Sequence, residues 1–152
     1  MTTGILYYAK GTLRVTKATD EDGKVQPNML GGHDITTTTY SFSGKPLTVT
    51  HAHTATGKTS RTEVYTYTYD EKDRVSTVKH KLGSTEVTLA TYTYDTFGRM
   101  AARKLHGSAT NQLTYTYNIQ SWLTGISSTK FTQTLTYNNG TTGFNGNISS
   151  MN

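Results

Sequence analysis

Four histidines are the first residues in this chain that could bind a metal ion: His51, His53, His80 and His106. His51 follows Tyr40 by eleven residues, and His80 follows Tyr69 by the same interval. If these segments stack as equivalent repeats, imidazoles from neighbouring strands can meet as zinc ligands. The alternative is that each histidine faces water at the end of a strand. Because the chain has no Cys and no acid near His106, we predict no bound metal.

Three aspartates could instead supply calcium ligands or an acid–base pair: Asp70, Asp73 and Asp95. Calcium loops place several oxygen ligands at alternate positions, whereas Asp70 and Asp73 are three residues apart. An Asp or Asn at the same place after several tyrosines is better explained by turn formation, which suits a short polar side chain. A catalytic pair would not be expected to recur in this way. We therefore predict no catalytic residues and no enzyme activity.

A short segment, Gly57-Lys58-Thr59, matches the last three residues of a phosphate-binding loop. That motif requires a glycine five residues earlier, where this chain has Ala52, and it lies between a strand and a helix. Here a Thr-rich linker leads towards Tyr65. The sequence therefore predicts no nucleotide and no other cofactor.

Aromatic side chains could stack on sugars or on nucleic-acid bases, and the net charge of +5 favours an acidic partner. All ten acidic residues lie at or before Asp95, but the cations beyond it are scattered and are not interleaved with the rings. We therefore predict no nucleic-acid partner. Trp122 is a candidate for contact with a carbohydrate. The simpler interpretation is that the rings pack on one another across strands.

A tyrosine-anchored repeat explains most of these residues. Its anchors are Tyr40, Tyr69, Tyr94, Tyr117 and Tyr137, and Tyr8 begins a degenerate earlier copy. Intervals of 29, 25, 23 and 20 residues between the anchors indicate a unit of twenty-odd residues with a variable linker. We assign the repeat motif to Tyr69, Asp70, Arg74, Tyr94, Asp95, Gly98, Arg99, Tyr117, Asn118 and Trp122.

Each unit is predicted to form a β-hairpin. Tyr and Thr alternate before the anchor, as in residues 65–69, which places the rings on one face of a strand. The next residue is Asp, Asn or Ser, which can accept a hydrogen bond from the amide two residues on. The position three residues later needs left-handed backbone. It is occupied by Gly44, Asp73, Gly98 or Ser121. A basic residue usually follows, and then a second strand at residues 75–80, 100–105 and 123–128.

The composition also favours an all-β fold. Only 33% of the residues are hydrophobic, and Thr, Tyr and Val are the residues that fit a pleated, half-buried surface. Such a sheet lacks the aliphatic residues for a thick core, so we expect it to be one layer of a larger object. No apolar run reaches membrane-spanning length, and the first residues lack the pattern of a signal peptide.

The pattern Y-x-Y-D-x-x-G-R-[LVM] resembles the YD-repeat family, whose units are also called rearrangement-hotspot (RHS) repeats. Residues 92–100 (YTYDTFGRM) and 67–75 (YTYDEKDRV) carry the resemblance most fully, and it extends over residues 36–149. The surrounding sequence looks like the repeat regions of large surface proteins of Bacteroides-like bacteria. The departures are Ser41 after the first anchor, and Lys45 and Trp122 in place of Arg.

The resemblance implies a structural role. In this family, hairpins form a long sheet that spirals into a hollow shell, which encloses or carries another segment, often a toxic C-terminal domain in bacteria. The family's chemistry lies outside the repeats. The expected protein is thus a non-catalytic, secreted or cell-surface segment whose partners are neighbouring repeats and a C-terminal effector domain. The alternative is an extracellular carbohydrate-binding or cell-surface adhesion module.

Two regions follow from the repeat pattern. Residues 1–35 are expected to be a degenerate N-terminal repeat with a linker, and residues 36–152 are expected to be the YD-repeat array. The predicted fold is all-β, with tandem antiparallel β-hairpins in one twisted, curved sheet that forms a segment of a larger β-shell. The outermost strands would leave backbone donors and acceptors unpaired, and chains could self-associate through these open edges.

Overall fold

The computed structural model describes residues 2–8, 11–17, 31–137 and 146–152. In this part of the chain nearly all regular structure is β-strand, and the one helical element is a 3-10 turn, η1 (Ala109–Asn111). Among the described residues, no helix has the length and hydropathy needed to cross a membrane. The predicted all-β fold of tandem antiparallel hairpins is confirmed.

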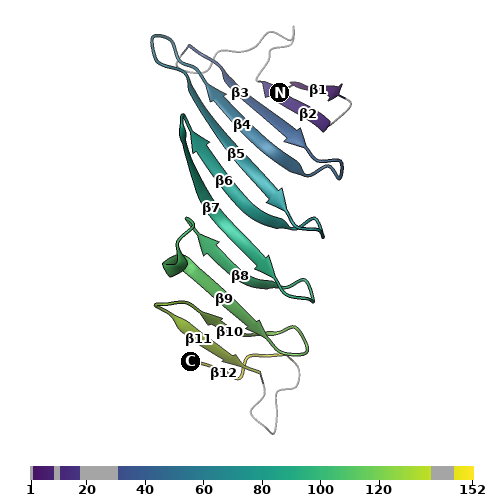
Figure 1. The fold of residues 1–152 in the computed structure, drawn as a ribbon, viewed down its shortest axis with the longest axis vertical. Helices are drawn as coiled ribbons and strands as arrows, with labels where there is room; N and C mark the ends of the chain where they lie inside the picture. The colour runs from purple at the N-terminus through teal and green to yellow at the C-terminus, as the bar shows by residue number, and fades with distance from the viewer. Residues whose placement is uncertain (1, 9–10, 18–30, 138–145) are drawn as a thin grey trace. The chain divides into compact units, whose positions relative to one another are not determined.

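The chain divides into two compact units, residues 1–87 and 88–152. Each strand of the first unit pairs antiparallel with the next one along the chain (Figure 1). These strands are β1 (Thr2–Tyr8), β2 (Gly11–Lys17), β3 (Asp34–Tyr40), β4 (Pro46–His53), β5 (Arg61–Tyr69) and β6 (Val75–Leu82). The predicted boundary between residues 35 and 36 stays a prediction.

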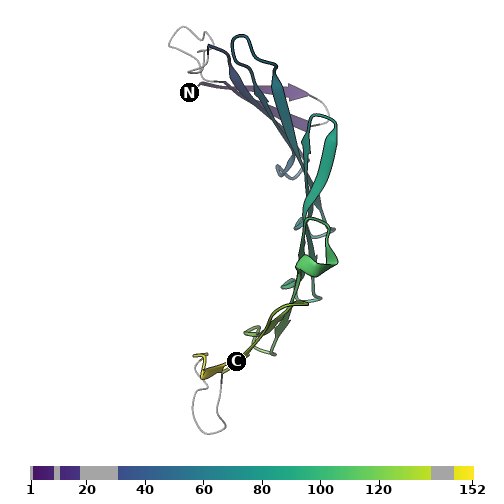
Figure 2. The ribbon, with the colours of Figure 1, turned by 90° about the vertical axis from the view of Figure 1, so that its left-hand side faces the viewer.

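The second unit continues the same up-and-down order. Its strands are most of β7 (Thr85–Tyr94), then β8 (Met100–Leu105), β9 (Gln112–Tyr117), β10 (Leu123–Ser127), β11 (Thr132–Thr136) and β12 (Ser150–Met151). Successive strands again pair antiparallel. Seen edge-on, each unit is one layer thick (Figure 2). Accordingly, Ala90 is the only fully buried hydrophobic residue in the described part of the chain.

The alternation of Tyr and Thr separates the two faces of the sheet as predicted. In β9 the side chains of Leu113, Tyr115 and Tyr117 are half-buried, whereas Thr114 and Thr116 are exposed. Because side chains alternate along a strand, the rings gather on one face and bury area against their cross-strand neighbours. In β9 the threonines form the wetter face. Threonines also pair across strands where they are half-buried, as Thr39 Oγ1 and Thr48 Oγ1 do at 2.6 Å.

The anchor tyrosines mark the ends of strands. Strands β3, β5, β7 and β9 end at Tyr40, Tyr69, Tyr94 and Tyr117. Strand β8 has the predicted bounds. Strand β6 was predicted to end at His80, and it ends two residues later, at Leu82. The fifth anchor, Tyr137, follows β11. The sequence predicts an Asn139-Gly140 turn in this unit, and these two residues lie outside the described residues.

Candidate functional site: the turn ladder

The four turns after these anchors share one backbone conformation. In the turn of residues 95–99 the Gly98 amide donates to the Asp95 carbonyl at 3.0 Å, and the Asp95 amide donates to the Arg99 carbonyl at 2.9 Å. Equivalent bonds close the turns that begin at Ser41, Asp70 and Asn118. The fourth residue has positive φ in each turn, which confirms the predicted left-handed position. The φ angles are 80° at Gly44, 61° at Asp73, 87° at Gly98 and 66° at Ser121.

The carboxylate that opens two of these turns is held in the same way in both. Asp95 Oδ1 accepts from the amides of Phe97 (3.0 Å) and Arg99 (2.9 Å), and Oδ2 accepts from Arg99 Nε at 2.7 Å. Asp70 makes the matching bonds to the amides of Lys72 and Arg74 and to Arg74 Nε. The carboxylates therefore organise turns, and neither is presented for acid–base chemistry.

The other two turns refine the sequence prediction. Asn118 Oδ1 accepts from the Trp122 amide at 2.9 Å, and Ser41 Oγ accepts from the Lys45 amide at 3.1 Å. The bond common to all four turns thus goes to the amide four residues on. The predicted bond to the amide two residues on is confirmed for the two aspartates. At both aspartates one oxygen, Oδ1, accepts from the two amides, and Oδ2 remains for the arginine side chain.

These contacts lower the pKa of both carboxyl groups. The hydrogen bond from the Arg74 side chain is the largest cause that holds the pKa of Asp70 at about 2. At Asp95, desolvation works to raise the pKa, but the hydrogen bonds and charge of Arg99 together lower it. Both groups therefore stabilise the fold in their ionised form.

A pH dependence of stability follows from this shift. Because the folded pKa values lie below the unfolded value near 4, the stabilisation is complete above pH ~4 and is lost as the pH falls towards 2. Asn can open the same turn, as Asn118 does. We therefore expect an Asp70→Asn/Asp95→Asn double variant to fold, and to melt below the wild type at pH 6. Thermal melts followed by circular dichroism should show this difference shrinking between pH 5 and pH 2. A difference that stays constant would contradict the assignment.

Each of the four hairpins that contain these turns also has a β-bulge that sequence analysis missed. In the second unit Thr93 pairs with Ala102, but Tyr94 pairs with Met100, so Ala101 is the extra residue. The same shift follows the anchors Tyr40, Tyr69 and Tyr117. A bulge disrupts the ladder locally and leaves backbone groups without strand partners.

Three anchor tyrosines each donate a hydrogen bond to the carbonyl beside the bulge of the preceding hairpin. The Tyr69 hydroxyl donates to the Pro46 carbonyl (2.7 Å), and Pro46 is the first residue of the second strand in the preceding hairpin. The Tyr117 hydroxyl likewise donates to the Met100 carbonyl (2.9 Å), and Tyr137 donates to the Leu123 carbonyl (2.6 Å). Burial raises the pKa of Tyr69 and Tyr117, so both stay protonated donors at neutral pH. The tyrosine therefore joins one repeat to the one before it.

Removing one hydroxyl tests this joint. We expect Tyr117→Phe to lower the free energy of unfolding by about 1 kcal/mol, since the Met100 carbonyl loses its donor while the ring remains. Chemical denaturation followed by circular dichroism measures the change. Tyr115→Phe is the matched control, because the Tyr115 hydroxyl has no hydrogen-bond partner among the described residues. Equal losses in the two variants would show that the Tyr117 bond contributes nothing.

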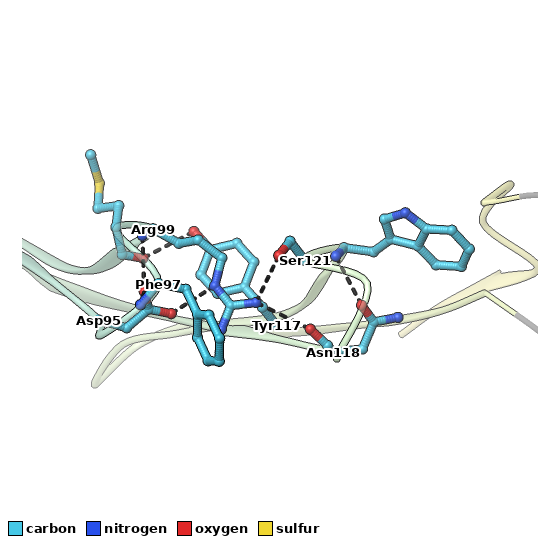
Figure 3. A network of polar contacts seen from close by, with 8 residues as sticks. Asp95, Phe97, Arg99, Tyr117, Asn118 and Ser121 are labelled. Atoms are coloured by element: carbon cyan, nitrogen blue, oxygen red, sulfur yellow. Dashed lines mark hydrogen bonds and ion pairs between the residues drawn. The ribbon is translucent and has the colours of Figure 1, made fainter.

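The basic residue after the left-handed position makes the second joint (Figure 3). Arg99 Nη1 donates to the Asn118 carbonyl at 3.1 Å and to Ser121 Oγ at 3.2 Å, both in the next turn. The guanidinium carbon lies 4.7 Å from the ring centre of Tyr117 and 4.9 Å from that of Phe97. Arg99 therefore links its own turn, through Asp95, to the turn that follows.

The departures from Arg keep this contact by other means. Lys45 Nζ donates to the Asp73 carbonyl of the following turn and lies 5.6 Å from the ring centre of Tyr69. Trp122 places its ring 5.1 Å from that of Tyr137. Cationic and aromatic groups both bind well to the face of a tyrosine ring. We call these turn residues, together with the anchor tyrosines that they contact, the turn ladder. In the sequence, only the fixed spacing from Tyr to Arg indicated these contacts between turns.

The histidines do not form a metal site in the described part of the chain, where no group of three His, Asp or Glu side chains could hold an ion. The His80 ring packs on Tyr65 at 4.7 Å between ring centres, and His80 Nε2 lies 3.1 Å from Glu63 Oε2. His51 meets the edge of the same Tyr65 ring. His53 pairs with Asp34, and His106 lies just after β8 with φ of 51°.

These contacts predict no stoichiometric zinc at neutral pH. His80 is engaged by a carboxylate and a ring, and His51 accepts or donates a bond to Thr36 Oγ1 at 3.0 Å. Metal analysis after dialysis, together with calorimetry, should find none. One tightly held equivalent that is lost in a His51→Ala/His80→Ala variant would contradict this prediction.

The remaining sequence candidates fall in ordinary connections. Gly57-Lys58-Thr59 lies between the antiparallel strands β4 and β5, where Gly57 has φ of 69° and the Lys58 amide donates to the Ala55 carbonyl. This is a turn between two strands, and a phosphate-binding loop requires a strand followed by a helix.

No protein-family model matches the chain, and no curated protein matches it either. The turn ladder itself offers no nucleophile with an adjacent base and no cluster of metal ligands among the described residues. Its polar groups bond to backbone and to one another. Chemically, this arrangement joins hairpins into an array.

Proposed function

We propose that the chain is a non-catalytic structural segment of the YD-repeat shell type, which encloses or presents a distal domain. The observation that carries the proposal is the turn ladder, in which the motif residues Tyr69, Arg99, Tyr117 and Trp122 each contact a neighbouring hairpin. Arg99, for example, donates hydrogen bonds to Asp95 and to the next turn. A motif devoted to joining repeats favours a wall over a site of chemistry.

The single-layer units support the same role. A sheet with so few buried side chains leaves both faces available to neighbouring layers. The proposed partners are further repeats of a parent chain and a C-terminal effector domain, and the proposed location is outside the cell or on its surface.

Limited proteolysis of the complete native polypeptide that contains these residues tests the proposal. A segment next to the array should resist proteinase K in the wild type and should become cleavable in a Gly98→Val/Arg99→Ala variant. A native reading frame that encodes no adjoining segment would overturn the proposal, as would equal cleavage rates. Binding to a glycan array that is abolished by Trp122→Ala would favour the carbohydrate-binding alternative.

A further inference from the structure

One cation of the second unit lies on the face that carries the aromatic rings. Arg103 in β8 pairs across strands with Tyr92 of β7 and with Leu113 of β9. Residues paired in this way share a face of the sheet. We call this surface the tyrosine face of the second unit, and it comprises Tyr92, Arg103, Leu105, Leu113, Tyr115 and Ile126.

Within the described part of the chain, the charge of Arg103 has no counter-ion. Residues 88–152 contain four Lys and Arg residues against one acid, Asp95, and that carboxylate is bound to Arg99 at 2.7 Å. Among the described residues, Arg103 makes neither a hydrogen bond nor an ion pair, and its Nε atom is buried without a partner. A guanidinium that has lost part of its water without gaining an acceptor is destabilising.

The groups around Arg103 suit a carboxylate. Unlike Nε, the two Nη nitrogens of Arg103 are not buried. A guanidinium group binds a carboxylate in a bidentate manner. The hydroxyls of Tyr92 and Tyr115 have no hydrogen-bond partner within the described chain and can donate as well. Leu113 and Ile126 are half-buried on the same face and offer apolar contact on the β9 and β10 side of the charge.

We propose that the tyrosine face of the second unit binds an acidic, otherwise apolar segment of a partner polypeptide in extended conformation. A Glu or Asp of this segment is held by Arg103, and its apolar residues cover Leu113 and Ile126. Charge complementarity selects the carboxylate, and the aliphatic and aromatic surroundings select an apolar segment over a highly hydrated anion. The surface binds in this way whether or not the array belongs to a shell.

Two peptides and three variants test the proposal. The probes are acetyl-LTETLTL-amide, whose Glu and Leu side chains share one face of an extended strand, and its counterpart in which Glu is Gln, and binding to the whole chain is measured by calorimetry. We expect the Glu peptide to bind the wild type at least tenfold more tightly than the Gln peptide. Arg103→Gln and Arg103→Met should abolish that preference.

The matched control is Lys104→Gln, which removes the same charge from the next residue. Lys104 pairs with Thr91 and Gln112 and so lies on the opposite face. It should keep the full preference for the Glu peptide. Arg103→Met is expected to melt no lower than the wild type, because it removes an unsatisfied charge, so loss of binding in that variant is not loss of fold.

Several outcomes would overturn the proposal. These are equal affinity for the two peptides, equal weakening by Lys104→Gln and Arg103→Gln, and absence of binding to the wild type. Displacement of the Glu peptide by sialyllactose at matched concentration would assign the surface to an anionic glycan instead. Failure here leaves the shell function untouched, since that function is tested by protection of an adjoining segment.

Discussion

Replacing Gly98 with Val is expected to lower the free energy of unfolding by roughly 1–3 kcal/mol. Gly98 has φ of 87°, a conformation that a β-branched side chain adopts only under strain. The strain falls on the turn that also carries Asp95 and Arg99, so the ladder contacts of that turn weaken with it. Thermal and denaturant unfolding followed by circular dichroism measures the change.

Asp73→Gly is the matched comparison. Asp73 occupies the equivalent position with φ of 61°, and glycine relieves the strain of that conformation at the cost of a more flexible unfolded chain. We expect this variant to be as stable as the wild type or slightly more stable. If both variants lost the same stability, the left-handed backbone would not be the property that matters at these positions.

Replacing Arg99 with Ala is expected to lower the free energy of unfolding by about 2–3 kcal/mol. The variant loses the charged hydrogen bonds to the Asn118 carbonyl and to Ser121, and the contacts with the rings of Tyr117 and Phe97. The side chain is only 21% exposed, so solvent screens these contacts weakly. Denaturant unfolding gives the value.

Arg99→Lys separates charge from geometry. Lysine keeps the charge and the contact with Tyr117, as Lys45 does with Tyr69, but it lacks the fork that reaches two turns at once. We expect an intermediate loss. Lys130→Ala is the control for charge alone, because Lys130 is exposed and its side chain makes no ion pair within the described residues. If Lys130→Ala lost as much stability as Arg99→Ala, the contacts of the turn ladder would not explain the effect of Arg99→Ala.

These effects are large for a surface turn because the units have little core to support them. With Ala90 as the one fully buried hydrophobic residue described, stability comes from strand pairing, ring contacts and the joints between hairpins. Interactions between neighbouring repeats then account for a large share of the stability of such an array.

The sequence by itself determined the fold class and the hairpin unit. Alternation of Tyr with Thr requires an extended strand with two different faces, because side chains point to opposite sides at successive residues. Asp95 and Gly98 predicted the turn because short polar side chains bond to nearby amides and Gly tolerates positive φ. These are local properties, which a short stretch of sequence carries completely.

The tertiary structure alone decided how one hairpin holds the next. The bulge at Ala101 depends on the register with a partner strand, and the bond from Tyr117 to the Met100 carbonyl joins residues seventeen apart. The sequence placed a cation after three of the four turns but could not say that Arg99 reaches the next turn, or that Trp122 packs on Tyr137 in the same role. Nor could it show that Arg103, on the same face as the rings, has no counter-ion among the residues that the structure describes. Such contacts depend on which strands become neighbours, and only the assembled sheet fixes that.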